Sequence, residues 1–305
     1  MAPVPANAVT SNLGYFSTVS CSGSYSCVAV GTYEDANEYQ WALLDTFSDG
    51  SWTTTEAPLP ANAGDNPNAQ LVSSSCGGPG SCVAVGIYTD MNGSVDDLIE
   101  TLSDGVWTAT EAPLPANGVA WFGDELKSVS CGGPGSCVAV GQYLDEDSGE
   151  GGLIETLSDG VWTATKAPVP DNGSVGSTFL TSVSCYGTGF CVTDGGGIFD
   201  TLSNGTWTAT EAPNPTNFLS CDGPGSCVAV VQSGNPHTNT PPLIETLWNG
   251  IWTVTEAPLP ANAGFTMGAT PAASLLSVSC DGPSFCVAVG QYYSIDRAEG
   301  LIETN

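Results

Sequence analysis

Short runs of alternating hydrophobic and polar residues recur along the whole chain and are separated by segments rich in Gly, Pro and Ser. In the clearest copy, residues 126–131 and 137–143 alternate in this way on either side of the segment Cys131-Gly-Gly-Pro-Gly-Ser-Cys137. A period of two with β-branched residues predicts two half-buried strands joined as a hairpin. Two further runs follow at 153–157 and 161–165, with Ser-Asp-Gly between them, a strong hairpin signal. The unit therefore predicts four antiparallel strands, here called A, B, C and D.

The same unit recurs six times, with variable spacing. Repeats of four antiparallel strands are typical of a β-propeller, because each unit is too small to bury its own apolar face. We predict one six-bladed β-propeller domain over residues 1–305; an open β-solenoid is the alternative. The last copy contains no run equivalent to strand D, so we expect three strands there. Residues 2–8 match the segment that follows strand D elsewhere, and residues 1–12 are expected to close the ring. The predicted blades span residues 13–60, 70–115, 125–170, 179–215, 217–260 and 274–305.

All twelve cysteines fall into pairs with the spacing Cys-x5-Cys. Because each pair sits at facing ends of a predicted hairpin, the two cysteines should lie within disulfide range. Metal or redox sites favour Cys-x2-Cys spacings, and the single histidine, His237, could not serve six sites. We therefore predict six local disulfides and a secreted protein in an oxidising compartment. The predicted pairs are Cys21–Cys27, Cys76–Cys82, Cys131–Cys137, Cys185–Cys191, Cys221–Cys227 and Cys280–Cys286.

Two features of the repeat resemble known families. The Ser-Val-Ser-Cys…Cys-Val-Ala-Val-Gly unit, as at residues 128–141, is similar to repeats of secreted actinobacterial proteins; this resemblance implies a fold and not an activity. The Ser-Asp-Gly-x-Trp turn, as at residues 103–107, resembles the Asp-box of sialidase-type propellers but is shorter than that motif. Signatures of WD40 and kelch propellers are absent from the sequence.

The charge of the chain is strongly negative. There are 32 Asp and Glu residues but only three basic ones, Lys127, Lys166 and Arg297, which gives a net charge of −29. Nucleic acid is excluded as a partner because phosphate binding needs clustered basic side chains. Anionic membrane surfaces repel such a chain, and no apolar run is long enough for a membrane span. Cations, neutral glycans and basic proteins remain as ligand classes.

The connections between strands B and C and between D and the next A differ from copy to copy, whereas the A–B and C–D turns are nearly uniform. Variation among repeats indicates the functional face, so the B–C/D–A face is our candidate binding surface. Exposed aromatics there could stack on sugar rings or anchor a partner protein; alternatively they pack back onto the loops. The candidate ligand-binding residues are Tyr39, Trp41, Trp121, Phe122, His237, Tyr293 and Arg297.

Other residues recur at one position of the unit, which favours a structural role. A tryptophan in strand D predicts packing between blades, and a tyrosine after strand B predicts packing as well. A carboxylate at one position of strand C predicts a repeated hydrogen bond better than a single active site. These residues are Trp52, Trp107, Trp162, Trp207 and Trp252; Tyr33, Tyr88, Tyr143 and Tyr292; and Asp45, Glu100, Glu155, Asp200, Glu245 and Glu303.

Two acidic loops place oxygen-bearing side chains at alternate positions, as calcium loops do. They are residues 90–97 and 145–150, and neither matches an EF-hand. Solvated acidic loops are the alternative interpretation. The candidate calcium ligands are Asp90, Asn92, Ser94, Asp96, Asp145 and Asp147.

Enzyme chemistry has little support in the sequence. Binding of a sialate carboxylate in the sialidase family uses several arginines, and this chain has one; His237 has no nucleophile-elbow motif near it. The pattern favours a secreted, non-catalytic module that binds a glycan or a protein partner. The alternatives are a carboxylate-based glycosidase or calcium-dependent propeller hydrolase or lyase, and a structural assembly protein with an open strand edge.

Overall fold

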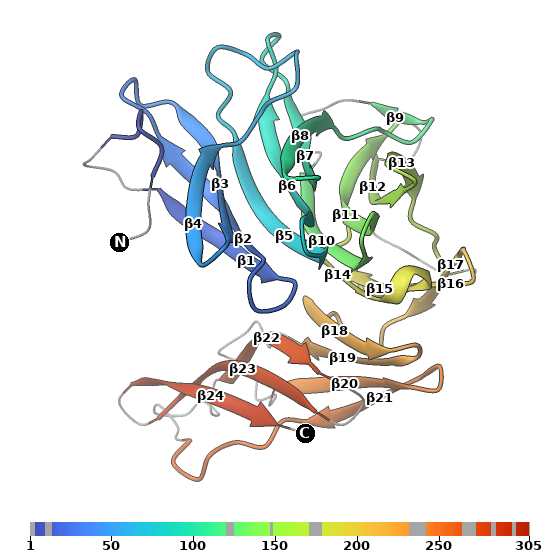
Figure 1. The fold of residues 1–305 in the computed structure, drawn as a ribbon. Coiled ribbons are helices and arrows are strands. Elements are labelled where there is room, and N and C mark those ends of the chain that lie inside the picture. Colours follow the sequence, from blue (N-terminus) through green and yellow to red (C-terminus); the bar gives the residue numbers. More distant parts are fainter. Residues whose placement is uncertain are drawn as a thin grey trace. The chain divides into compact units, whose positions relative to one another are not determined.

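Six antiparallel sheets follow one another along the chain, and the main path through each sheet takes its strands in sequence order (Figure 1). The computed structural model describes residues 4–9, 14–119, 125–146, 149–170, 179–231, 242–263, 273–281, 285–294 and 297–304. The protein is an all-β, six-bladed β-propeller, as the repeat pattern predicted. Among the described residues, the sixth blade has three strands, also as predicted. No helix in these ranges is long and apolar enough to cross a bilayer.

The chain forms two compact units, the first comprising residues 1–167 and 177–180. The first unit contains blades 1 to 3, and each blade begins with strand A, which forms one edge of its sheet. Blade 1 consists of β1 (Tyr15–Cys21), β2 (Cys27–Glu34), β3 (Gln40–Ser48) and β4 (Ser51–Glu56). Blade 2 consists of β5 (Gln70–Gly78), β6 (Ser81–Thr89), β7 (Val95–Ser103) and β8 (Val106–Glu111). Blade 3 consists of β10 (Glu125–Gly133), β11 (Ser136–Asp145), β12 (Gly149–Ser158) and β13 (Val161–Lys166), with β9 (Gly118–Val119) paired to β11.

The second unit, residues 168–176 and 181–305, contains blades 4 to 6. Blade 4 consists of β14 (Ser182–Tyr186), the 3-10 turn η1 (Gly187–Gly189), β15 (Phe190–Gly195), β16 (Ile198–Ser203) and β17 (Thr206–Glu211). Blade 5 consists of β18 (Phe218–Gly223), β19 (Ser226–Val231), β20 (Leu243–Trp248) and β21 (Ile251–Glu256). Blade 6 consists of β22 (Ala273–Cys280), β23 (Cys286–Tyr293) and β24 (Ala298–Thr304).

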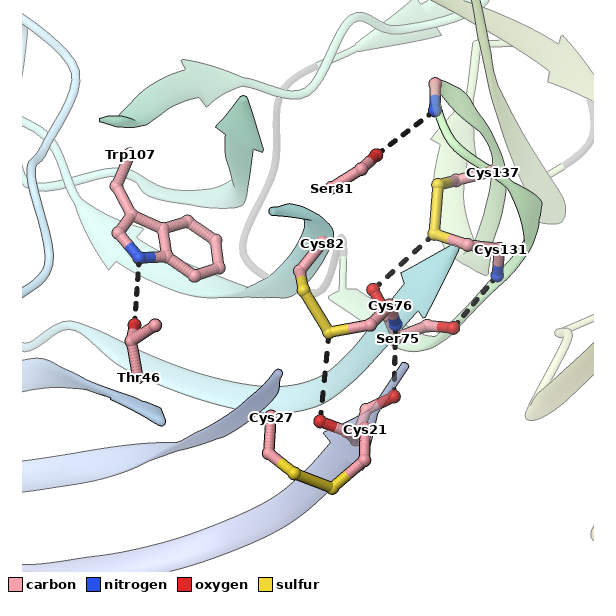
Figure 2. The surroundings of a disulfide bond; sticks show 12 residues. Cys21, Cys27, Thr46, Ser75, Cys76, Ser81, Cys82, Trp107, Cys131 and Cys137 are labelled. Atoms are coloured by element: carbon pink, nitrogen blue, oxygen red, sulfur yellow. Dashed lines mark hydrogen bonds between the residues drawn. A yellow bond between two sulfur atoms is a disulfide. The ribbon is translucent and has the colours of Figure 1, made fainter. Parts of the chain in front are cut away.

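A disulfide closes the A–B hairpin of every blade, so the cysteine prediction is confirmed in full. In each hairpin the two cysteines are direct partners in the strand register, as for Cys131 and Cys137. Their Cα atoms lie 3.9–4.0 Å apart, at the short end of cross-strand spacings. Figure 2 shows three of these disulfides, from blades 1 to 3.

The C–D turn has the backbone geometry that its sequence predicts. Asp104 has φ +51° and Gly105 has φ +77°, which is the left-handed pair required by a two-residue turn of type I′. This turn sets the register in which Leu102 faces Trp107. The tryptophan therefore reaches the same place in every complete blade.

The hydrophobic core lies between consecutive sheets within each unit. Between blades 1 and 2, for example, Val28 and Leu44 of one sheet pack with Cys82 and Leu98 of the next. The glycine of Val-Ala-Val-Gly is required by a close approach within the blade, since a Cβ on Gly86 would lie 1.9 Å from the carbonyl oxygen of Gln70. The repeat motif thus specifies both the sheet and the surface that the next sheet covers.

The B–C connections of blades 1 to 3 are shorter than the sequence pattern suggested. In blade 3 the expected strands at 137–143 and 153–157 extend to β11 and β12, which pair as far as Asp145 and Gly149. Polar residues do not end β11 and β12, because the backbone hydrogen bonding between two strands can continue beyond the region where side chains are buried. In blades 1 and 2 the variable face therefore carries short turns, at residues 35–39 and 90–94.

Candidate functional site

A pocket of about 470 Å³ lies between blades 1 and 2 in the first unit. It lies at the end of the blades that carries the A–B and C–D turns, opposite to the surface favoured by sequence variation. Aromatic rings, hydroxyls and one carboxylate are found among its lining residues. Those that carry the argument below are Tyr25, Thr46, Phe47, Asp49, Thr53 and Trp107.

Trp107 is held at the pocket by strand β8 and by the neighbouring blade. Its indole Nε1 donates a hydrogen bond to the Thr46 hydroxyl of β3, at 3.4 Å (Figure 2). Trp162 makes the same contact with Thr101, at 3.3 Å, one blade further along. The predicted packing of strand D tryptophans between blades is therefore observed at both positions. In blade 2 the half-buried ring also contributes to the pocket wall.

Tyr25 comes from the A–B turn of blade 1, where the sequence departs from the other repeats. Blade 1 has Ser-Gly-Ser-Tyr-Ser between its cysteines, whereas blade 2 has Gly-Gly-Pro-Gly-Ser. The side chain of Tyr25 is 74% exposed, so its ring is available for contact with a ligand. Tyr25 is not among the residues predicted from the sequence, although its departure from the repeat is a signal that could identify it.

Asp49 is the one carboxylate among the described lining residues of this pocket. It lies in the C–D turn of blade 1 with φ +51°, followed by Gly50, and it is exposed. Hydrolysis of a glycosidic bond uses a pair of carboxyl groups that flank the bond. The described lining of this pocket therefore combines one carboxylate with the hydroxyl groups of Thr46, Thr53 and Thr55.

The predicted aromatic binding residues fall into three groups. Tyr39 is 37% exposed and precedes β3, and Trp41 lies within β3; neither lines the pocket. Tyr293 ends β23 and is 43% exposed. Trp121, Phe122 and His237 lie outside the described residues. Their roles in binding stay predictions.

Arg297 belongs to a small polar cluster at the tip of blade 6. Its Nε donates to Glu299 Oε1 at 3.2 Å, and the Tyr292 hydroxyl donates to Glu299 Oε2 at 2.7 Å. The hydrogen bond from Tyr292, with those from Ser294 and Arg297, lowers the pKa of Glu299 to about 2. Lys166 pairs with Asp145, and Lys127 contacts Glu125. All three basic residues are therefore engaged by carboxylates.

The acidic loop at residues 90–94 is a tight turn organised by Asp90. Asp90 Oδ1 accepts hydrogen bonds from the backbone N–H groups of Asn92 (2.8 Å) and Ser94 (2.7 Å). Burial acts to raise the pKa of Asp90, but these N–H donors and the Asn92 side chain outweigh it and hold the pKa below its ordinary value. Asp35 makes the equivalent bonds to Asn37 and Tyr39 in blade 1. A turn-forming role thus accounts for Asp90 and for its recurrence.

The other predicted calcium ligands do not join Asp90 in an acidic cluster. Asp96 lies in β7 opposite Tyr88, Asp145 pairs with Lys166, and Asp147 lies outside the described residues. Where the structure is described, no group of three or more His, Cys, Asp or Glu side chains could hold a metal ion. The calcium prediction therefore rests on the sequence pattern alone.

Five of the six recurring strand C carboxylates are buried, but these residues do not share one hydrogen bond. Asp45 accepts from the Thr54 hydroxyl at 2.9 Å, and Glu245 accepts from the Asn214 side chain at 2.9 Å. Both carboxyl oxygens of Glu100 and of Glu155 have no hydrogen-bond partner in the described part of the chain. Burial raises the pKa of Glu100 to about 9, and burial with the nearby Asp97 charge does the same for Glu155. The expectation of a uniform hydrogen bond was wrong.

A polar cluster that the sequence did not predict secures the D–A connection. The Tyr88 hydroxyl donates to Asn62 Oδ1 at 2.9 Å, and Asn62 Nδ2 donates to Glu111 Oε2 at 3.0 Å. In blade 6 the Tyr292 hydroxyl lies 3.1 Å from Asn262 Oδ1, in addition to its shorter contact with Glu299. The recurrence of Pro-Ala-Asn after strand D was the available signal. The buried tyrosines after strand B are thus packing residues whose hydroxyl groups also make polar contacts, in agreement with their predicted role.

Comparisons with known proteins support the fold. No family model matches the chain, and a search of curated proteins finds no match. Among solved structures, a protein of unknown function from Dyadobacter fermentans is 12% identical, with a TM-score of 0.53 over 96% of this chain and 95% of that one. YCF48 from Cyanidioschyzon merolae is 13% identical, with a TM-score of 0.50 over 91% and 77%. The Hadza microbial sialidase Hz136 is 13% identical, with a TM-score of 0.52 over 94% of this chain and 64% of that one. At these identities the similarity concerns the fold alone.

Proposed function

We propose that this protein is a secreted, non-catalytic binding module that takes a neutral glycan in the pocket between blades 1 and 2. The observation that carries the proposal is the composition of the pocket. Tyr25, Phe47 and Trp107 supply aromatic surface, and Thr46 and Thr53 supply hydroxyl groups. Sugar rings present apolar C–H faces and a rim of hydroxyls, so a site of this kind combines stacking with hydrogen bonding.

The composition of the pocket favours a binding role over a catalytic one. A propeller glycosidase would need two carboxyl groups about 5–9.5 Å apart around the scissile bond. The pocket lies between two sheets and has Asp49 as its one described carboxylate. This composition supports a binding site.

The negative charge of the chain favours neutral glycans over anionic ones as ligands. With a net charge of −29, the surface repels anionic sugars such as sialylated or sulfated glycans. Asp49 at the pocket adds to that repulsion. A neutral hexose or deoxyhexose carries no charge and meets no such penalty.

The six disulfides support the proposal that the protein is secreted. All six cysteine pairs are oxidised, which is typical of proteins that fold outside the reducing cytosol. A binding module in such a location would meet polysaccharides and glycoproteins directly.

The decisive experiment is a screen of neutral and acidic glycans with the full chain, followed by analysis of the bound glycans for cleavage products. We expect saturable binding of a neutral glycan with no product. Repeating the screen in calcium and in EDTA tests the acidic loops, and loss of binding in EDTA would assign the site to those loops. Product formation would contradict the non-catalytic role, and selective binding of sialylated glycans would contradict the ligand class.

A further inference from the structure

Blade 4 departs from the repeat at one buried position of its strand B. The motif Cys-Val-Ala-Val of the other blades is replaced by Cys-Val-Thr-Asp at residues 191–194, and Asp194 is fully buried. The equivalent residues of the other blades are Val30, Val85, Val140, Val230 and Val289. The scaffold thus works with valine at this position, and burial of a carboxylate costs free energy unless it is paired. A role other than packing must account for Asp194.

Asp194 faces a second buried carboxylate, Glu245, across the boundary between blades 4 and 5. Val192, two residues before Asp194 in β15, packs in one hydrophobic cluster with Leu247, two residues after Glu245 in β20. Side chains two apart on a strand point to the same side, so both carboxylates point into this boundary. Burial raises the pKa of Asp194 to about 6, and the charge of the nearby Glu245 contributes to the increase. Glu245 is fully buried as well.

Thr216 adds a hydroxyl group to this pair. It lies in the connection between β17 and β18, residues 212–217, and is 4% exposed. Its side chain lowers the pKa of Asp194, which indicates that the hydroxyl lies beside that carboxylate. Thr216 Oγ1, Asp194 Oδ2 and Glu245 Oε2 are all buried, and none has a hydrogen-bond partner within the described residues. Three segments of the chain therefore each contribute one oxygen atom that is available to a ligand.

The other oxygen of each carboxylate is held by the protein. Asp194 Oδ1 accepts a hydrogen bond from the Thr181 hydroxyl at 2.9 Å. Glu245 Oε1 accepts one from the side-chain amide of Asn214, also at 2.9 Å. Hydrogen bonds of this kind orient the ligands of a metal ion. Both carboxylates are thus fixed before a ligand arrives.

Two carboxylates buried together require a positive charge to compensate for their lost hydration. In the described structure the three basic residues of the chain pair with other carboxylates. A proton shared between Asp194 and Glu245 would hold two of their oxygens in a hydrogen bond. Asp194 Oδ2 and Glu245 Oε2 make no such bond where the chain is described. A metal cation would satisfy both carboxylates and the hydroxyl of Thr216.

We propose that Asp194, Glu245 and Thr216 bind a calcium ion between blades 4 and 5. Calcium takes oxygen ligands in a flexible geometry, and bidentate carboxylates and backbone carbonyl groups can fill further positions around it. Magnesium keeps several of its waters, which a closed cluster does not accommodate. The site lies in the second unit, whereas the acidic loops at residues 90–97 and 145–150 and the glycan pocket lie in the first. The proposal therefore does not depend on the proposed function.

The test is titration calorimetry of calcium chloride into the full chain after removal of metals with EDTA. We expect saturable binding of about one ion per chain. Calcium at about 100 times its Kd should raise the unfolding temperature by about 2 °C or more. Asp194→Val gives blade 4 the residue of the other five blades, and it should weaken calcium binding by about tenfold or more. Glu245→Gln keeps the size of the side chain and should weaken binding to a similar extent.

Asp159→Asn is the matched control. It also removes one carboxylate, from an exposed turn, and it introduces the residue that blades 4 and 5 have at the equivalent position, Asn204 and Asn249. This variant should bind calcium like the original chain. The proposal is overturned if the original chain shows no saturable calcium binding or binds magnesium more tightly. It is also overturned if Asp194→Val binds calcium unchanged, which would assign the ion to the acidic loops instead.

Discussion

The hydroxyl of Ser75 accepts a hydrogen bond from the backbone N–H of Cys131 in the next blade, at 2.9 Å (Figure 2). The same contact joins Ser20 to Cys76 at 3.0 Å. In the second unit the Cys221 N–H donates to the Ser184 hydroxyl, and the Cys280 N–H donates to the Ser220 hydroxyl. The serine that precedes the first cysteine of a blade therefore serves the neighbouring blade. This explains why the repeat has Ser-Cys and not any small polar residue beside the cysteine.

Replacing Ser75 by alanine should destabilise the contact between blades 2 and 3. The substitution removes the acceptor of a part-buried hydrogen bond from the Cys131 N–H, and the expected loss is about 1 kcal/mol, the lower end of the range for a donor left without its partner. The measurement is the free energy of unfolding in urea with the disulfides intact. Ser103→Ala, at an exposed turn position, is the matched control and should change stability by less than about 0.5 kcal/mol. Equal effects of the two substitutions would contradict the role of Ser75.

The six disulfides predict the behaviour of the thiols. Under denaturing conditions without reductant, an alkylating reagent should add no mass, and after reduction it should modify all twelve cysteines. Replacing Cys76 and Cys82 together by alanine should lower the free energy of unfolding by about 2 kcal/mol, because the disulfide closes a short loop. Mass spectrometry and urea unfolding check the two outcomes. Modification of the unreduced protein would contradict the disulfide assignment.

The burial of Glu100 predicts that the free energy of unfolding falls as pH rises from about 4.5 to about 9. Burial raises the pKa of Glu100 from 4.5 to about 9 in the folded protein. Across this range the folded state keeps a proton that the unfolded state has lost, so increasing pH favours unfolding. Glu100→Gln removes that proton exchange. The variant should gain stability relative to the original chain as pH rises, by up to about 1.4 kcal/mol per pH unit.

Unfolding midpoints measured between pH 5 and pH 8 test this prediction. Glu150→Gln makes the same chemical substitution at an exposed position, and it should show no such increase with pH. If both variants respond to pH alike, the effect comes from the overall charge of the chain and not from burial of Glu100.

Tyr25 should contribute to ligand binding without contributing to stability. It is 74% exposed and lines the pocket, so Tyr25→Ala is expected to weaken glycan binding at least tenfold while changing the melting temperature little. Tyr186 is a suitable control because it is also exposed and lies in the A–B hairpin of blade 4. Titration calorimetry with the best glycan of the screen compares the two variants. Equal affinities would place the ligand elsewhere on the molecule.

The fold was predictable because each local signal agrees with the others. Cys131 and Cys137 flank a glycine- and proline-rich turn, and they became direct cross-strand partners. The Asp-Gly pair at 104–105 specified the second hairpin, with positive φ at both residues. These features depend on neighbours in sequence, so the sequence alone determines them.

The candidate site was less predictable because it depends on contacts between blades. Trp107 has the same sequence context as the other strand D tryptophans, and its place in a pocket follows from the residues around it, including the irregular residue Tyr25. The missing partners of Glu100 could not be inferred either, since its carboxylate position recurs with different surroundings in each blade. The repeated residues of this sequence therefore indicate the shared architecture of the blades, and the proposed binding site depends on a residue, Tyr25, that departs from the repeat.

The scarcity of basic residues also affects how the chain meets proteases. Enzymes that cut after lysine or arginine find three candidate bonds in 305 residues. Lys127 lies within β10 and Lys166 ends β13, so both are in paired strands, and Arg297 alone lies at a turn. Because proteolytic cleavage concentrates at exposed loop tips, the folded protein should be a poor substrate for trypsin-like enzymes. The scarcity of lysine and arginine that makes this protein acidic should therefore also make the folded protein resistant to trypsin-like proteases.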